Sequence, residues 1–185
     1  MNAKINICSL IKGHIKTLYD ASTQRLSYSD IVTFFILPAV IAILCSFWGV
    51  YLSNDIISLL VNFGSIFTAL LLSVLVLVYD QVGKVTEKLN DDKNENDLML
   101  KLKSRLLQDL YFNISYSMVL SLFLIVLCFF YSMSCEFVLT IPYIETELSI
   151  SRLFFLPAII FVTMNLLLTI LMIIKRLHFL LISKN

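Results

Sequence analysis

The chain has 185 residues, of which 59% are hydrophobic and only 15% are charged, and its formal net charge is +1 at pH 7. A soluble domain carries about 45–50% apolar and about 25% charged residues, so this composition excludes an ordinary soluble enzyme. A net charge so close to zero gives no indication of direct nucleic-acid binding.

Four stretches contain no Asp, Glu, Lys or Arg, and each is longer than the about 20 apolar residues with which a helix crosses hydrocarbon. They predict an all-α membrane protein with four transmembrane helices, at about residues 31–53, 56–79, 110–135 and 153–174. The first two spans are joined by little more than Ser53-Asn54-Asp55, so we expect residues 31–79 to form one transmembrane hairpin. Residues 110–174 would form a second hairpin with a short outer loop.

Basic residues predict the orientation, because Lys and Arg in short loops are retained in the cytoplasm. Thirteen of the 14 Lys and Arg residues lie in the N-terminal segment 1–30, the connector 80–109 or the tail 175–185. These three segments share one side of a four-span topology, and only Arg152 falls on the other. Both termini are therefore predicted to be cytoplasmic.

The N-terminal segment 1–30 contains a predicted amphipathic helix. Apolar residues recur at steps of three and four while Lys12 and Lys16 lie on another face; the apolar set is Ile7, Leu10, Ile11, Ile15 and Leu18. We expect this helix to lie on membrane lipids at the inner surface. The alternative is a partner-binding helix in the cytoplasm.

The connector 80–109 is predicted to be a cytoplasmic helical hairpin between spans 2 and 3. One apolar stripe continues the second span and another, beginning at Leu98, leads into the third, with turn-forming residues between them. An apolar ridge flanked by charge suits docking of a protein, so the expected partner-binding residues are Leu98, Lys101, Leu102, Arg105 and Leu106. The alternative is a solvated connector whose leucines pack only against each other.

Nothing in the sequence indicates catalysis or a cofactor. The four predicted spans contain no ionisable Asp, Glu, Lys or Arg, and no metalloprotease, nucleophile-elbow or phosphate-loop motif is present. The only histidines, His14 and His178, lie outside the spans, and we expect neither to have a role. The four cysteines form no C-x-x-C pair and are expected to be packing residues. The prediction is a non-enzyme without metal or cofactor.

Small and polar residues line one face of the second span at helical spacing: Ser58, Asn62, Ser65, Ala69 and Ser73. Such stripes let helices approach closely and exchange hydrogen bonds, so Asn62, Ser65 and Ala69 are predicted to form an oligomer or packing seam. Asn113, Ser117 and Ser121 form a similar stripe on the third span. The alternative is the lining of a pore made by several subunits.

Pro38 lies inside the first predicted span and has no backbone N–H. The carbonyl of Phe34, four residues earlier, therefore lacks its usual helical donor. We expect a kink at this position.

The whole layout resembles one known family. The features are the basic amphipathic N-terminus, Leu26-Ser-Tyr-Ser-Asp-Ile-Val-Thr-Phe-Phe-Ile-Leu-Pro38 entering the first span, the minimal outer hairpin and the helical connector. Together they are similar to the KwaA family of membrane subunits of the Kiwa bacterial anti-phage defence system.

That resemblance implies a multi-pass, homo-oligomeric sensor or scaffold in the bacterial inner membrane. It also implies recruitment of a KwaB-like cytoplasmic effector that binds DNA, without direct nucleic-acid binding by this chain. The alternatives are an oligomeric pore-forming abortive-infection effector and a bacteriocin immunity-type membrane protein.

Overall fold

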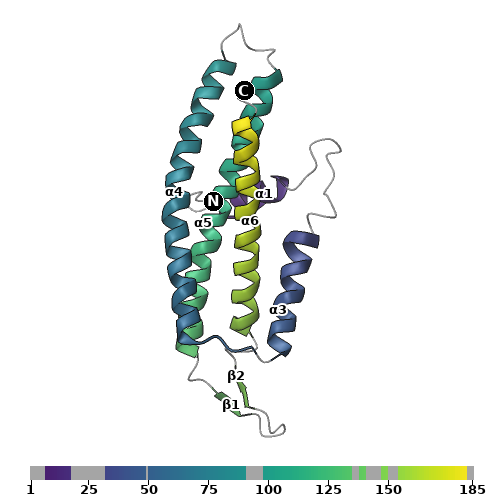
Figure 1. The fold of residues 1–185 in the computed structure, drawn as a ribbon, viewed down its shortest axis with the longest axis vertical. Helices are drawn as coiled ribbons and strands as arrows, with labels where there is room; N and C mark the ends of the chain where they lie inside the picture. The colour runs from purple at the N-terminus through teal and green to yellow at the C-terminus, as the bar shows by residue number, and fades with distance from the viewer. Residues whose placement is uncertain are drawn as a thin grey trace. The chain divides into compact units, whose positions relative to one another are not determined.

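The structure is a computed structural model that describes residues 7–17, 32–48, 50–90, 98–134, 138–140, 147–149 and 154–182 (Figure 1). Helices dominate these residues. In chain order they are α1 (Ile7–Thr17), the π-helical segment η1 (Val32–Ile36), α3 (Leu37–Phe47), α4 (Asn54–Leu89), α5 (Leu98–Ser134) and α6 (Leu156–Ile182).

Three of the helices are long and apolar enough to cross a membrane: α4, α5 and α6 over Leu156–Leu180. α4 contains the predicted second span, and α5 and α6 contain the predicted third and fourth spans except for the end residues 135 and 153–155. The predicted first span is helical only over Val32–Phe47, which is 16 residues. At about 1.5 Å per residue it is about 24 Å long, short of the about 30 Å hydrocarbon core. The described structure thus supports a helical membrane protein with three candidate spans.

The connector 80–109 is largely helical. α4 continues to Leu89, and α5 begins at Leu98, well before the apolar stretch that starts at Leu110. The predicted turn between them, residues 91–97, lies outside the described residues. Likewise, only Ile7–Thr17 of the N-terminal segment 1–30 can be compared with the prediction.

The buried residues of each long helix follow a seven-residue repeat. On α4 they recur every seven positions, at Ile57, Gly64, Leu71, Val78 and Val85. On α5 they alternate at steps of four and three, at Leu110, Ile114, Ser117, Ser121, Leu124, Cys128 and Tyr131. On α6 the same alternation joins Ile159, Val162, Leu166, Thr169 and Ile173. Each helix therefore has an inward seam with the spacing of left-handed coiled coils, which further buried residues such as Asn113 on α5 and Asn165 on α6 widen.

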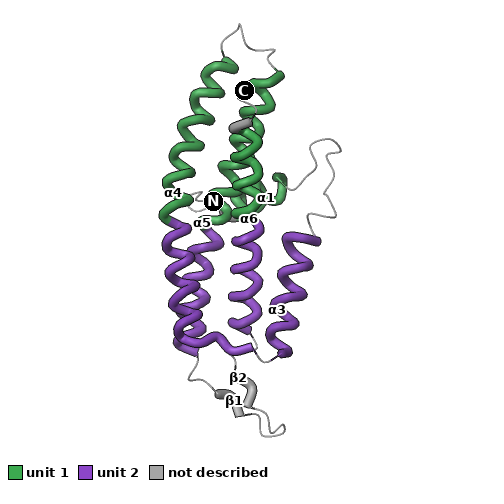
Figure 2. Tube along the Cα trace, in the orientation of Figure 1, with its two compact units in different colours: residues 1–27, 69–118, 169–185 green, residues 28–68, 119–168 purple. Residues whose placement is uncertain are grey.

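The chain divides into two compact units, to each of which α4, α5 and α6 contribute residues (Figure 2). The first unit comprises residues 1–27, 69–118 and 169–185. Its apolar core joins all three long helices through Leu71, Val78, Val85, Leu107, Leu110, Ile114 and Ile173. Val85 of α4 and Leu107 of α5 both belong to this core, so the helical parts of the connector pack against the same cluster.

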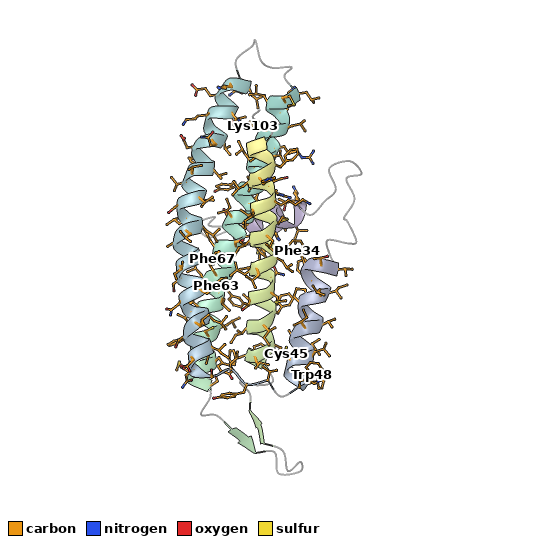
Figure 3. All side chains as sticks on the ribbon, viewed as in Figure 1. Phe34, Cys45, Trp48, Phe63, Phe67 and Lys103 are labelled. Atoms are coloured by element: carbon orange, nitrogen blue, oxygen red, sulfur yellow. The ribbon has the colours of Figure 1, made fainter. Side chains whose placement is uncertain are left out.

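The second unit comprises residues 28–68 and 119–168, and it contains η1 and α3. Here a π-helical turn, Val32–Ile36, directly precedes α3, whose first turn contains Pro38. The amide of Asn165 on α6 donates a hydrogen bond to the carbonyl of Phe34 at 2.7 Å. A side chain 131 residues away thus replaces the donor that proline lacks. Phe34 lies on the α6 side of the segment in Figure 3.

α4 and α5 approach closely in this unit. A Cβ atom at Gly64 would lie 3.1 Å from a side-chain carbon of Ile125 and 3.2 Å from the backbone oxygen of Ser121. Nearby, the hydroxyls of Thr68 and Ser121 are 2.7 Å apart. Gly64 therefore permits a contact that is closed by a hydrogen bond between the helices.

The sequence did not predict the small antiparallel ribbon that follows α5. Strands β1 (Val138–Thr140) and β2 (Glu147–Ser149) pair with Leu139 opposite Leu148. The prediction for this region is a short outer loop without assigned secondary structure. With three residues per strand, the pattern is too short for alternation to distinguish it from a loop.

Candidate functional site

The most structured polar group in the described residues lies in the first unit, where α1 contacts α5 and α6. The buried face of α1 consists of Gly13, His14 and Thr17, with Leu10 half-buried beside them. These residues are spaced three and four apart, so they share one face of the helix. Of the predicted apolar stripe, Ile11 is exposed, whereas Leu10 and Ile15 are half-buried. The fully buried contacts of α1 are therefore made by small and polar residues.

Gly13 determines how closely α1 can approach α5. A Cβ atom at this position would lie within 3 Å of three ring carbons of Phe112. The flat face of an aromatic ring cannot yield as the end of a flexible chain does, so a larger residue would push the helix outward. The close approach brings His14 and Thr17 within bonding distance of α5.

Asn113 of α5 accepts hydrogen bonds from the side chains of His14 and Thr17. The Nδ1 atom of His14 lies 2.9 Å from Asn113 Oδ1, and the Thr17 hydroxyl lies 2.8 Å from the same oxygen. The hydroxyl also lies 2.7 Å from the backbone oxygen of His14, so it has two acceptors for one proton. Because an amide oxygen only accepts, Nδ1 of His14 carries the ring proton in this arrangement.

Arg176 of α6 closes the group from the other side. Its Nη2 atom donates a 2.8 Å hydrogen bond to the backbone oxygen of Thr17, the last residue of α1. A carbonyl at a helix C-terminus lacks an intrahelical donor and carries the negative end of the helix dipole, so a guanidinium is a favourable partner. Asp109 lies 3.6 Å from Arg176 Nη1 and balances the buried charge. We call His14, Thr17, Asn113 and Arg176 the N-terminal clasp.

His14 is only 1% exposed, and its ring stacks on Tyr116 with centroids 3.9 Å apart. Burial, opposed by the hydrogen bond to Asn113 and assisted by the nearby Arg176 charge, lowers the pKa of His14 from 6.5 to about 4. The ring is therefore neutral at physiological pH. His14 thus makes structural contacts, within the clasp, that the sequence did not indicate.

The clasp binds parts of the chain to one another and shows no arrangement suited to catalysis. Its histidine is neutral, stacked and enclosed, and its threonine hydroxyl is occupied by two acceptors. Among the described residues, no group of three or more His, Cys, Asp or Glu side chains is placed to hold a metal ion. The physical effect of the clasp is to fasten α1 to α5 and α6.

The expected partner-binding residues occupy one outward face of α5. Leu98 is 70% exposed and Leu102 is 50% exposed, and Lys101 and Arg105 are also exposed. Leu106 is half-buried. The core is instead formed by Leu107, on the side of the helix opposite Leu98, and by Leu110, one turn after Leu106. The exposed residues of the predicted ridge therefore do not pack in the core of the hairpin.

The opposite side of the same hairpin contains a pocket of about 620 Å³ that the sequence did not reveal. It lies in the first unit between α4 and α5, and Lys103, labelled in Figure 3, is one of its residues. The lining consists of Gln81, Lys84, Val85, Glu87, Lys88, Met99, Leu100 and Lys103. Three lysines and one glutamate around an apolar floor make the pocket basic.

The two predicted polar stripes differ in burial. Asn113, Ser117 and Ser121 on α5 are fully buried within the chain. The seam residues Asn62, Ser65 and Ala69 on α4 are all exposed, as are Ser58 and Ser73 of the same stripe. The hydroxyls of Ser65 and Ser73 bond to their own helix, to the carbonyls of Val61 and Ala69. The α4 stripe is therefore exposed, and its residues Ser58 and Asn62 also line a pocket of about 360 Å³ whose α5 side includes Cys128 and Ser132.

Comparison of the chain with protein-family models, with curated proteins and with solved structures finds no match. The functional argument therefore rests on the residues and geometry above.

Proposed function

We propose that this protein is a membrane-anchored scaffold that recruits a soluble cytoplasmic partner. The observation that carries the proposal is the hairpin formed where α4 and α5 continue beyond their uncharged stretches. Its arms share a core that includes Val85 and Leu107, whereas Leu98 and Leu102 remain exposed next to basic residues. A packed hairpin with an unburied apolar ridge suits docking of a protein.

The proposed topology has four spans with both termini in the cytoplasm. The first span would be the shorter helical segment η1 and α3, whose exposed apolar side chains include Val40, Ile43 and Leu44. Alkaline-phosphatase fusions, which are active only outside the cytoplasm, test it. We expect activity after Asn54 and near Glu145, and none near Asn94 or after Asn185. Activity of the Asn94 fusion would contradict the topology.

The partner should be recoverable through the exposed ridge. We expect a mild-detergent pull-down from the native host, with and without phage challenge, to recover a stoichiometric cytoplasmic protein identified by mass spectrometry. Leu98→Ser combined with Leu102→Ser should abolish its recovery. Gln108→Ala, which alters another exposed residue of α5, is the matched control. Equal recovery with both variants would exclude this ridge as the docking surface.

By resemblance, the biological setting we propose is anti-phage defence in a bacterial inner membrane, with a KwaB-like DNA-binding effector as partner. The support is the shared layout of amphipathic N-terminus, minimal outer hairpin and helical connector. A host strain lacking this chain should lose phage resistance, and the Leu98 and Leu102 double variant should fail to restore it.

We also propose that the chain forms a homo-oligomer through the α4 stripe. An exposed Asn62 amide in a candidate span is costly in hydrocarbon unless another helix supplies a partner. Native mass spectrometry should show the oligomer, and Ala69→Phe should weaken it without unfolding the chain, since Ala69 is exposed. Leu70→Phe, at an adjacent exposed position, is the control. Monomers alone in several mild detergents would contradict the proposal.

The same stripe favours one rival function, an oligomeric pore whose opening damages the cell. Hydroxyl and amide groups on one exposed helix face are the kind of surface that lines a water-filled path. The rival predicts rapid ion leakage from liposomes that contain this chain alone. Leakage together with failure to recover a partner would favour the pore over the scaffold.

A further inference from the structure

The basic pocket between α4 and α5 offers a second docking surface, distinct from the predicted ridge. Its α5 residues Met99, Leu100 and Lys103 lie on the side of the helix that faces α4, whereas Leu98, Lys101 and Leu102 face away. The volume of about 620 Å³ is large enough for several side chains of a ligand. Val85 and Leu100 form an apolar floor, and Met99, which is largely exposed, is flexible enough to adapt to different shapes.

The charge around the pocket selects an anionic ligand. Lys84, Lys88 and Lys103 contribute three positive charges against the single negative charge of Glu87. Lys84 is already paired with Asp80 at 2.6 Å. Lys88 and Lys103 are therefore the cations through which a bound carboxylate or phosphate would be recognised.

Position along the helices distinguishes a protein ligand from a lipid headgroup. The uncharged stretches end at Tyr79 on α4 and begin at Leu110 on α5. At about 1.5 Å per residue, Lys88 lies about 13 Å beyond the first limit and Lys103 about 10 Å beyond the second. A headgroup layer is only about 5–7 Å thick on each side of the bilayer. Both lysines lie beyond that layer, which favours a soluble ligand.

We propose that this pocket binds an acidic amphipathic helix of the soluble partner, with apolar side chains on the Val85 and Leu100 floor and carboxylates at Lys88 and Lys103. A helix that lays its apolar face into a groove between two helices is a common recognition mode. The proposal rests on the proposed scaffold function and specifies the chemistry of the partner.

The test uses the full chain in nanodiscs of uncharged phosphatidylcholine and a fluorescent amphipathic peptide rich in Glu and Leu. Fluorescence anisotropy should show saturable binding that weakens as salt concentration rises. Lys88→Gln combined with Lys103→Gln should raise the Kd about three- to tenfold, as expected for the loss of two exposed charge contacts. Lys12→Gln combined with Lys175→Gln removes the same charge from exposed positions outside the pocket and the ridge, and should change the Kd less than about twofold.

Three results would overturn the proposal: equal weakening by the two double variants, equal binding of a peptide with Lys in place of Glu, or no peptide binding. Loss of peptide binding when phosphatidylglycerol is added to the nanodisc, with no change for the Lys88 and Lys103 variant, would assign the pocket to lipid headgroups instead. The peptide assay needs no native partner. Failure of the pull-down with intact peptide binding would therefore refute the ridge and leave the pocket standing.

Discussion

The hydrogen bond between Asn165 and the Phe34 carbonyl can be tested against its stated cause, the missing N–H of Pro38. Replacing Asn165 by leucine keeps most of the side-chain volume and removes the 2.7 Å donor. Removing a buried hydrogen bond costs about 0.5–1.5 kcal/mol, and cycles between membrane helices average about 0.6 and reach about 1.7 kcal/mol. We expect Asn165→Leu to lower the free energy of unfolding by about 1–1.5 kcal/mol.

Pro38→Ala restores a backbone N–H four residues after Phe34, so the π-helical turn can become a regular one that satisfies the same carbonyl. In that background Asn165→Leu should cost less than about 0.5 kcal/mol, since the acceptor no longer depends on the side chain. The assay is reversible unfolding by SDS in mixed micelles, followed by circular dichroism. Thr163→Val, which removes a hydroxyl bonded to its own helix at Ile159, is the matched control and should be near neutral in both backgrounds. An equal cost of Asn165→Leu in the parent chain and in the Pro38→Ala background would refute the explanation.

Three further outcomes follow from the packing. His14 has a pKa of about 4 in the folded chain and 6.5 in the unfolded chain. The free energy of unfolding should therefore be highest above pH 6.5 and fall by about 3 kcal/mol as the pH drops toward 4. Unfolding measured across this range should show that fall in the parent chain and lose it in His14→Asn. Gly13→Val should displace α1 from Phe112 and speed proteolysis of the N-terminal segment, whereas an unchanged cleavage rate would show that the close contact is dispensable. Gly64→Val should destabilise the chain by about 1–3 kcal/mol in the SDS assay, while Gly83→Val, with nothing within 4 Å of its Cβ position, should have little effect beyond helix propensity.

The sequence revealed the elements that depend on local composition. Long uncharged runs identified α4, α5 and α6, because a helix that crosses a membrane needs about 20 consecutive apolar residues. The sequence overestimated the length of the helix that contains Pro38, because the uncharged, apolar stretch continues to Ser53 whereas the helix ends at Phe47. Apolar character alone does not extend a helix.

The clasp and the pocket were missed for a different reason. His14 reads as an isolated residue until the fold brings Asn113, which is 99 positions away, to its ring. Similarly, the spacing of polar residues on α4 and α5 is alike, yet Asn113 is buried and Asn62 is exposed. Periodicity identifies a face of a helix but does not determine what covers that face.

The clasp has a consequence for the order in which the protein is made. Thr17 and its partner Arg176 are separated by 159 positions, so a ribosome adding about 5–20 residues per second completes the second about 10–30 s after the first. During that interval α1 has neither its guanidinium nor, at first, its asparagine. The N-terminal helix can therefore contact α5 first, and it completes the clasp only after Arg176 of α6 has been synthesised.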